Sequence, residues 1–327
     1  MRGHKIRDCH GDLHLEHIHL TPKALSIYDC IEFNDRFRYI DVANDVAFLA
    51  MDFDRHERPD LSWEIAARMA DALRDNEMLR LMDFYKCYRA YVRGKVESFH
   101  QARAEVPETE QRKGHMQARR YFRLALRYAV CGSKPTVLIV MGHIASGKSM
   151  LASALGRELG CEVISSDRMR KQLAGVPLYE RDEKSARRLY SEAMTKKTYK
   201  ILSLNAASQL DRDASVILDA TFGRRQHRDE LSRLLESKGA TYRFIEAQAP
   251  AEVLKRRLEQ REGAKHEISD ARLNNFETLT RSYEAPSEVR TDHRLQVATD
   301  RPAPVTIEET LKGLVLAGFK STAHREK

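Results

Sequence analysis

The strongest constraint on the fold is the octapeptide GHIASGKS at residues 142–149, which fits the pattern G-x-x-x-x-G-K-[ST] at every fixed position. An apolar run, TVLIVM, precedes it, and an amphipathic segment, SMLASALGREL, follows it. In a strand–loop–helix context, the glycines let backbone N–H groups approach phosphate oxygens, and the helix N-terminus adds the positive end of its dipole. The octapeptide therefore predicts a nucleotide site on a parallel α/β sheet.

Within this octapeptide, the residue types predict individual roles. We expect Lys148 to reach the β- and γ-phosphates of ATP, and Ser149 to offer its hydroxyl to Mg²⁺. The predicted nucleotide-binding residues of the loop are Gly142, His143, Ile144, Ala145, Ser146, Gly147, Lys148 and Ser149. GTPases use related loops, but the guanine-specific sequence NKxD does not occur in the chain, which argues against that class.

After Pro135, short β-rich runs alternate with amphipathic helical segments. The runs are TVLIVMG, EVISSD, SVILDAT, YRFIEAQ and HRLQVAT. Such alternation predicts a parallel sheet with helices on both faces. Residues 41–130, by contrast, carry apolar side chains at helical spacing, with a break near Pro107. We therefore expect an α/β protein with two domains, a mainly helical one over 1–131 and a P-loop NTP-binding domain over 132–327.

Asp219 follows the apolar run SVIL, so its carboxylate is expected at the carboxyl end of a parallel strand, where it faces the phosphate crevice. There it would hold Mg²⁺ together with Ser149, directly or through water. An ordinary turn aspartate at the end of a strand is the alternative.

Asp167 and Arg170 follow another β-rich run and lie one helical turn apart, so both side chains are expected to project into one crevice. We expect Asp167 to accept a proton from a hydroxyl acceptor and Arg170 to hold an anionic group of that substrate. These two residues and Lys148 are the predicted catalytic residues. The alternative for Asp167 is a helix N-cap.

Two segments of this half resemble the adenylate-kinase-like branch of P-loop proteins. DATFGRR, which begins at Asp219, is similar to the strand-aspartate segment of that group, and AEVLKRRLEQRE is similar to its lid entry. The resemblance implies that Arg257 lies against the adenine and that Arg261 touches the transferring phosphate. A solvated helix face is the alternative. The D-x-x-R pair at 167–170 resembles that of polynucleotide 5′-hydroxyl kinases, which implies a nucleic acid or a small molecule with a hydroxyl group as acceptor.

The N-terminal part opens on a histidine-rich run, CHGDLHLEHIH at residues 9–19. Its four histidines and two carboxylates are plausible metal ligands, but the spacing is neither HExxH nor CxxC, so we disfavour a zinc site. The pattern H-x-D-x-x-x-x-N fits better, with His17 in the place of the Asn. Together with the strand-like run LSIYDCIEF at 25–33, this loop resembles that of aminoglycoside phosphotransferases. The resemblance implies a vestigial kinase-like loop of His10, Asp12, His17 and Asp29, with Asp12 in the place of the catalytic base.

The residues before this loop, MRGHKIRDC, are too few for the nucleotide lobe of such a phosphotransferase. Residues 1–131 are therefore expected to be a truncated helical lobe with an accessory or substrate-binding role. The whole chain resembles bacterial tandem proteins that join an aminoglycoside-phosphotransferase-like domain to a predicted P-loop kinase. This implies an ATP- and Mg²⁺-dependent phosphotransferase that acts through its second domain. The alternative is an ATP-binding regulatory module that phosphorylates no acceptor.

The net charge of +8 is concentrated in the second half, where 34 Lys and Arg stand against 27 Asp and Glu, compared with 22 against 21 in residues 1–130. An anionic partner, either a phosphorylated small molecule or nucleic acid, fits this half. No apolar run approaches the ~18 residues of a membrane span, and the N-terminus lacks the apolar region of a signal peptide. Five scattered cysteines form no CxxC pair. We therefore expect a cytoplasmic protein with reduced thiols that does not engage a membrane.

Overall fold

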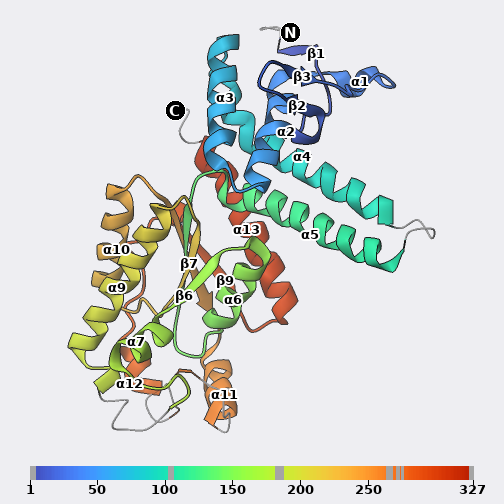
Figure 1. The fold of residues 1–327 in the computed structure, drawn as a ribbon. Coiled ribbons are helices and arrows are strands. Elements are labelled where there is room, and N and C mark those ends of the chain that lie inside the picture. The colour runs from blue at the N-terminus through green and yellow to red at the C-terminus, as the bar shows by residue number, and fades with distance from the viewer. Residues whose placement is uncertain are drawn as a thin grey trace. The chain divides into compact units, whose positions relative to one another are not determined.

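The computed structural model of the chain describes residues 5–101, 107–180, 188–262, 268–269, 273 and 276–323. The chain divides into two compact units, Met1–Ser133 and Lys134–Lys327, which are called the N-terminal unit and the P-loop unit below (Figure 1). In the described part of the chain, no helix combines the length and the apolar character that a membrane span requires.

The P-loop unit is built on a five-stranded parallel sheet with the strand order β6-β7-β5-β8-β9. The strands are β5 (Thr136–Met141), β6 (Glu162–Ser165), β7 (Val216–Asp219), β8 (Thr241–Gln248) and β9 (Arg294–Ala298). They fall within the β-rich runs of the sequence, and the predicted α/β fold class is confirmed. Every residue of the central strand β5 is buried, which explains its uninterrupted apolar sequence.

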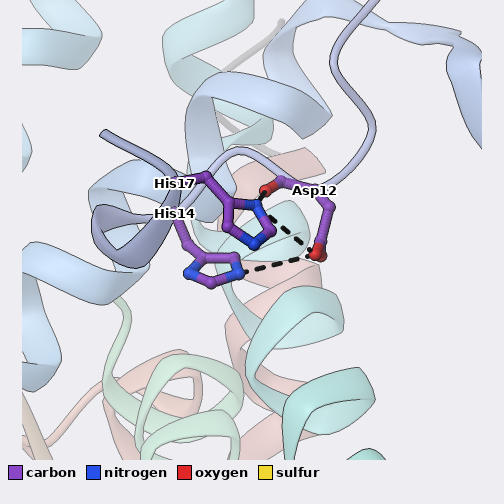
Figure 2. A group of neighbouring side chains, drawn as sticks. All are labelled: Asp12, His14 and His17. Atoms are coloured by element: carbon purple, nitrogen blue, oxygen red, sulfur yellow. Dashed lines mark hydrogen bonds and ion pairs between the residues drawn. The ribbon is translucent and has the colours of Figure 1, made fainter. Parts of the chain in front are cut away.

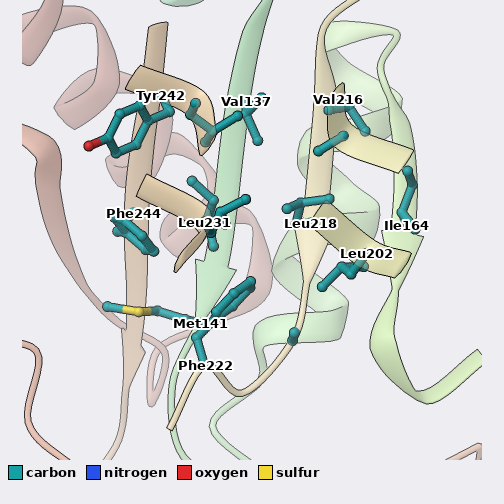
Figure 3. Packing of buried hydrophobic residues seen from close by; sticks show 14 of the residues in the cluster. Val137, Met141, Ile164, Leu202, Val216, Leu218, Phe222, Leu231, Tyr242 and Phe244 are labelled. Atoms are coloured by element: carbon teal, nitrogen blue, oxygen red, sulfur yellow. The ribbon is translucent and has the colours of Figure 1, made fainter. Parts of the chain in front are cut away.

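Helices cover both faces of this sheet, and the chain crosses from one strand to the next through them (Figure 1). They are α6 (Lys148–Leu159), α7 (Ser166–Ala174), α9 (Glu192–Leu210), α10 (Arg225–Ser237), α11 (Ala251–Glu262), α12 (Phe276–Arg281) and α13 (Ala303–Ala323), with a 3-10 turn η3 (Thr291–His293) before β9. Figure 3 shows the core on one face, where Leu202 of α9 and Leu231 of α10 pack with the sheet residues Val137 and Leu218. Each such buried leucine contributes about 1.5–3 kcal/mol, so this packing fixes the carboxyl edge of the sheet.

The N-terminal unit is mainly helical. It contains α1 (Asp35–Arg38), α2 (Val42–Arg55), α3 (Pro59–Leu73), α4 (Met78–Gln101), α5 (Glu108–Cys131), the 3-10 turn η1 (Leu15–His17) and two antiparallel strand pairs, β1 (Ile6–Asp8) with β4 (Tyr39–Asp41) and β2 (Ile18–Leu20) with β3 (Leu25–Ile27). The helices occupy the region that the apolar periodicity indicated.

The strand predicted over 25–33 is wrong beyond Ile27. Asp29 adopts a positive φ of 62°, which a strand does not accommodate. A few residues later, the side chain of Asn34 accepts a hydrogen bond from the Arg36 backbone N–H and caps α1. The local turn chemistry therefore ends the strand early.

Candidate active site

The loop between β5 and α6 adopts a backbone that few residues tolerate. Positive φ angles occur at Gly142 (142°), Ala145 (58°) and Gly147 (85°). A Cβ atom added at Gly142 would lie 2.4 Å from the carbonyl oxygen of Ala247, so a side chain there would collide with backbone. The Nζ of Lys148 lies 3.4 Å from the carbonyl oxygen of His143, which brings the amine back over the loop. The predicted nucleotide-binding residues thus form one compact turn at the N-terminus of α6.

Two residues outside the loop, Thr299 after β9 and Arg257 on α11, form hydrogen bonds with the loop backbone. The hydroxyl of Thr299 donates to the carbonyl oxygen of Ser146 at 2.6 Å. The Arg257 guanidinium donates to the carbonyl oxygen of Ala145 at 3.2 Å and also to that of Thr299. Burial lowers the pKa of Arg257, and the nearby charge of Arg261 lowers it further. Of the two arginines singled out in the sequence, Arg257 therefore lies beside the loop and bonds to its backbone, and Arg261 lies near Arg257 on α11.

Asp219 ends β7 and is almost fully buried, with 5% of its surface exposed. Its Oδ1 has no hydrogen-bond partner among the described residues. Burial raises the pKa of Asp219, although the charge of Lys148 and a hydrogen bond from Ser149 oppose this rise. A buried carboxylate oxygen without a donor is a position that a hard cation or a water molecule satisfies. Asp219 and Ser149 therefore fit the binding of Mg²⁺.

Asp167 and Arg170, which are predicted to engage the acceptor substrate, lie on α7. This helix begins at Ser166, and its N-cap is Ser165, so the alternative reading of Asp167 as the N-cap is wrong. A nitrogen of Arg170 lies 3.3 Å from an oxygen of Asp167. Arg170 is only 6% exposed, its guanidinium lies 4.5 Å from the centre of the Tyr190 ring, and its Nε has no partner among the described residues.

A cleft of about 420 Å³ joins the loop to this pair. Besides Lys148, Asp167 and Arg170, its lining includes one more arginine and several aromatic and histidine side chains: Arg224, His143, Tyr190, Tyr199, His227 and Tyr283. The ring of His143 lies 4.0 Å from that of Tyr283, and His227 stacks on Tyr199 at 4.1 Å. Burial lowers the pKa of both histidines, so each ring is neutral near pH 7. The cleft thus combines cations, one carboxylate and flat apolar surfaces.

Several residues of this region were not identified in the sequence. Thr299 carried a usable signal, since it is the last residue of the last β-rich run and the carboxyl ends of parallel strands line the ligand crevice. Tyr190 and Tyr283 carried none, because they reach the cleft from segments whose position depends on tertiary packing.

In the N-terminal unit, the four residues of the predicted kinase-like loop also come close together. Asp29 places Oδ2 3.2 Å from Nε2 of His17, and the Nδ1 of the same ring lies 3.7 Å from a carboxylate oxygen of Asp12. The His10 ring contacts the carbonyl oxygen of Tyr28 at 2.8 Å. The residues that the kinase-like pattern picked out in the sequence are therefore neighbours in the structure.

Comparison with known proteins adds a family match for the second unit. Residues 137–286 match a family model described as an AAA domain. The region contains the loop, Asp167, Asp219 and the α11 residues Arg257 and Arg261. This match and the sheet together define a P-loop domain.

Over most of its length the chain is similar to uncharacterized proteins of Mycobacterium tuberculosis and Mycobacterium bovis. The identity to each is 32% over 304 residues, which is 92% of this chain and 58% of the relative. The chain thus spans little more than half the length of the curated relatives it matches.

Among solved structures, a gluconokinase from Sinorhizobium meliloti 1021 aligns with a TM-score of 0.43 and 20% identity, covering 58% of this chain and 98% of that one. The APS kinase of Mycobacterium tuberculosis, in complex with AMPPNP and APS, aligns with a TM-score of 0.41 and 22% identity, covering 56% and 98%.

Proposed function

We propose that the protein is an ATP- and Mg²⁺-dependent kinase that transfers the γ-phosphate to a hydroxyl group through its P-loop unit. The observation that carries the proposal is the meeting of three groups at one sheet edge. They are the amine of Lys148 over the loop, the buried Asp219 oxygen that has no hydrogen-bond partner among the described residues, and Asp167, which lines the same cleft as Lys148. Phosphoryl transfer needs this combination of positioned cations and a base.

In this mechanism each residue has a separate task. Lys148 and the backbone N–H groups of the loop hold the β- and γ-phosphates. Ser149 and Asp219 would hold Mg²⁺, whose positive charge would neutralise the phosphate oxygens. Asp167 takes the proton of the acceptor hydroxyl, and the hydroxyl oxygen bonds to the γ-phosphorus. At the same time the bond between the γ-phosphorus and the β,γ-bridging oxygen breaks, and ADP leaves.

The arginines would act on the same phosphates. Arg170, buried beside Asp167, would hold an anionic group of the acceptor, and its unpartnered Nε fits that task. Arg257 keeps the loop in shape through Ala145, and Arg261 would contact the transferring phosphate. The N-terminal unit would be accessory or would contribute to substrate binding.

The experiment is γ-phosphate transfer from labelled ATP across an acceptor panel of 5′-hydroxyl oligonucleotides, nucleosides, sugars and aminoglycosides. We expect label on one acceptor class. In Asp167→Asn the transfer rate should fall by ~10²–10⁴-fold, because the variant lacks a base. ATP affinity should stay unchanged, since Asp167 does not bind ATP in this account.

Asp213→Asn is the control, because Asp213 is an exposed turn residue with a positive φ that asparagine also tolerates. Transfer by Asp167→Asn at the rate of this control would contradict the role of Asp167. ATP binding without transfer to any acceptor would instead favour the second candidate, a regulatory module that responds to bound ATP.

A further inference from the structure

The histidine-rich loop of the N-terminal unit is held in place by two buried carboxylates of α2. Asp45 accepts hydrogen bonds from the backbone N–H groups of His10 and Gly11 at 2.9 and 3.0 Å. Asp52 accepts one from Leu15 at 3.0 Å. These bonds fix the loop backbone on both sides of Asp12, so the side chains that it carries are preorganised.

The side chains of Asp12, His14 and His17 bring potential metal-ligand atoms close together. One ligand atom each of Asp12, His14 and His17 lie within 4.8 Å of one another, and Figure 2 shows both rings turned toward the Asp12 carboxylate. Its Oδ2 is 3.4 Å from Nε2 of His14 and 3.7 Å from Nδ1 of His17. Two ligands of a tetrahedral metal ion with bonds of 2.0–2.1 Å are separated by roughly 3.3 Å. The two distances from the Asp12 carboxylate oxygen to the imidazole nitrogens are close to this separation.

A second carboxylate stands behind each imidazole. Nδ1 of His14 faces Glu16 at 3.7 Å, and Nε2 of His17 faces Asp29 at 3.2 Å. Metal-ligating histidines commonly donate their other N–H to a carboxylate, which fixes the ring and strengthens the ligand. Here the two outer carboxylates lie on the sides of the rings that point away from Asp12.

Among the described residues, the nitrogens of the His14 and His17 rings face oxygen atoms. Both nitrogens of each ring face an oxygen, including the main-chain oxygen of Asp12 at 2.9 Å from Nδ1 of His17, whereas a neutral imidazole carries one N–H. A metal ion at the nitrogen that faces Asp12 would leave the other nitrogen of each ring to carry the N–H toward its outer carboxylate.

From this arrangement we propose that Asp12, His14 and His17 form a binding site for a divalent transition-metal ion. Glu16 and Asp29 act as its outer carboxylates. Two imidazole nitrogens and one carboxylate oxygen suit Zn²⁺, Co²⁺ or Ni²⁺ better than Mg²⁺, which prefers oxygen ligands throughout. Three protein ligands leave a fourth position for water or a ligand. The site does not depend on the proposed phosphotransfer, and His14 lies outside the fixed positions of the kinase-like pattern.

The test is zinc titration of the full chain, prepared without a histidine tag, stripped with EDTA and kept free of ATP. Calorimetry should give one Zn²⁺ per chain for the wild type. His17→Gln and Asp12→Asn should abolish that binding, and Asp29→Asn should weaken it by ~10–100-fold through the outer shell. His19→Ala is the matched control, because His19 is exposed on β2 and should leave zinc affinity unchanged.

Cobalt provides a second readout that needs no variant. The visible spectrum of the Co²⁺-loaded wild type should show the bands of a four-coordinate ion with nitrogen and oxygen ligands. Thiolate charge transfer would assign the metal to the free cysteines instead and overturn the proposal. It would also be overturned if the wild type bound no zinc, or if folded His17→Gln and Asp12→Asn bound zinc as tightly as His19→Ala.

Discussion

The two units bury charge in different ways. In the N-terminal unit, the amine of Lys86 contacts Asp54 at 3.0 Å and Ser62 at 2.7 Å, and the hydroxyl of Tyr128 donates to the same aspartate. In the P-loop unit, Asp219 is buried as deeply, but one of its oxygens accepts no hydrogen bond from a described residue.

This difference separates structure from function. A buried charge whose hydrogen bonds are all made within the fold holds the fold together, and removing one partner is costly. A buried charge left with an open oxygen costs stability in the free protein and becomes favourable only when a ligand arrives. By this criterion we assign the carboxylate of Asp219 to the proposed binding site and the Lys86–Asp54 pair to the scaffold.

The largest expected effect concerns the scaffold pair. Lys86→Met should lower the free energy of unfolding of the N-terminal unit by ~3–5 kcal/mol, because it leaves Asp54 buried without its cation. Urea denaturation followed by circular dichroism measures the change. Lys95→Met on the same helix is the control, since Lys95 is exposed and its charge should be worth no more than ~1 kcal/mol. If both variants lost the same free energy of unfolding, the buried Lys86–Asp54 pair would stabilise the unit no more than an exposed lysine does.

Asp219→Asn should have the opposite effect on stability. Near pH 7 we expect the ligand-free P-loop unit to gain about 1–3 kcal/mol, because the variant removes a buried charge without a full set of partners. Burial raises the pKa of Asp219 in the folded state, so the wild type loses stability as the pH rises through that raised pKa. The advantage of the variant should therefore vanish at a pH below the ordinary range of aspartate.

Thermal denaturation across this pH range measures the effect on stability, and Mg²⁺-dependent ATP binding measures the loss of function. A destabilised Asp219→Asn with normal Mg²⁺ dependence would mean that Asp219 is a scaffold residue like Asp54.

The smallest effect concerns the support of the loop. Arg257→Lys should weaken ATP binding by about tenfold, or ~1.4 kcal/mol, because a lysine cannot bond to Ala145 and Thr299 at the same time. Arg256→Lys is the control, since the neighbouring Arg256 is exposed. Calorimetric titration with ATP and Mg²⁺ compares the two variants, and equal affinities would exclude a supporting role for Arg257.

Much of the P-loop unit could be predicted because its signals are local. The octapeptide fixes a strand, a turn and a helix in order, and the buried central strand has to be apolar throughout. The position of Asp219 followed from the rule that parallel strands end at one edge. The aromatic lining of the cleft was not predictable, because Tyr190 and Tyr283 reach it from distant parts of the chain.

The histidine-rich loop teaches the opposite lesson. Its spacing matched no common metal pattern, yet His14 and His17 face the same carboxylate. The reason lies in bonds that the sequence does not reveal, since Asp45 and Asp52 on a later helix shape the loop backbone. The sequence also did not reveal the early end of β3, which follows from the positive φ of Asp29.

The most direct test of the central claim is γ-phosphate transfer from labelled ATP, measured side by side in the wild type, Lys148→Ala and Asp12→Asn. If the P-loop unit carries the reaction, Lys148→Ala should lose at least ~10²–10³-fold in rate, and Asp12→Asn should keep the wild-type rate. Transfer that survives in Lys148→Ala and disappears in Asp12→Asn would contradict the account and would assign the reaction to the histidine-rich loop.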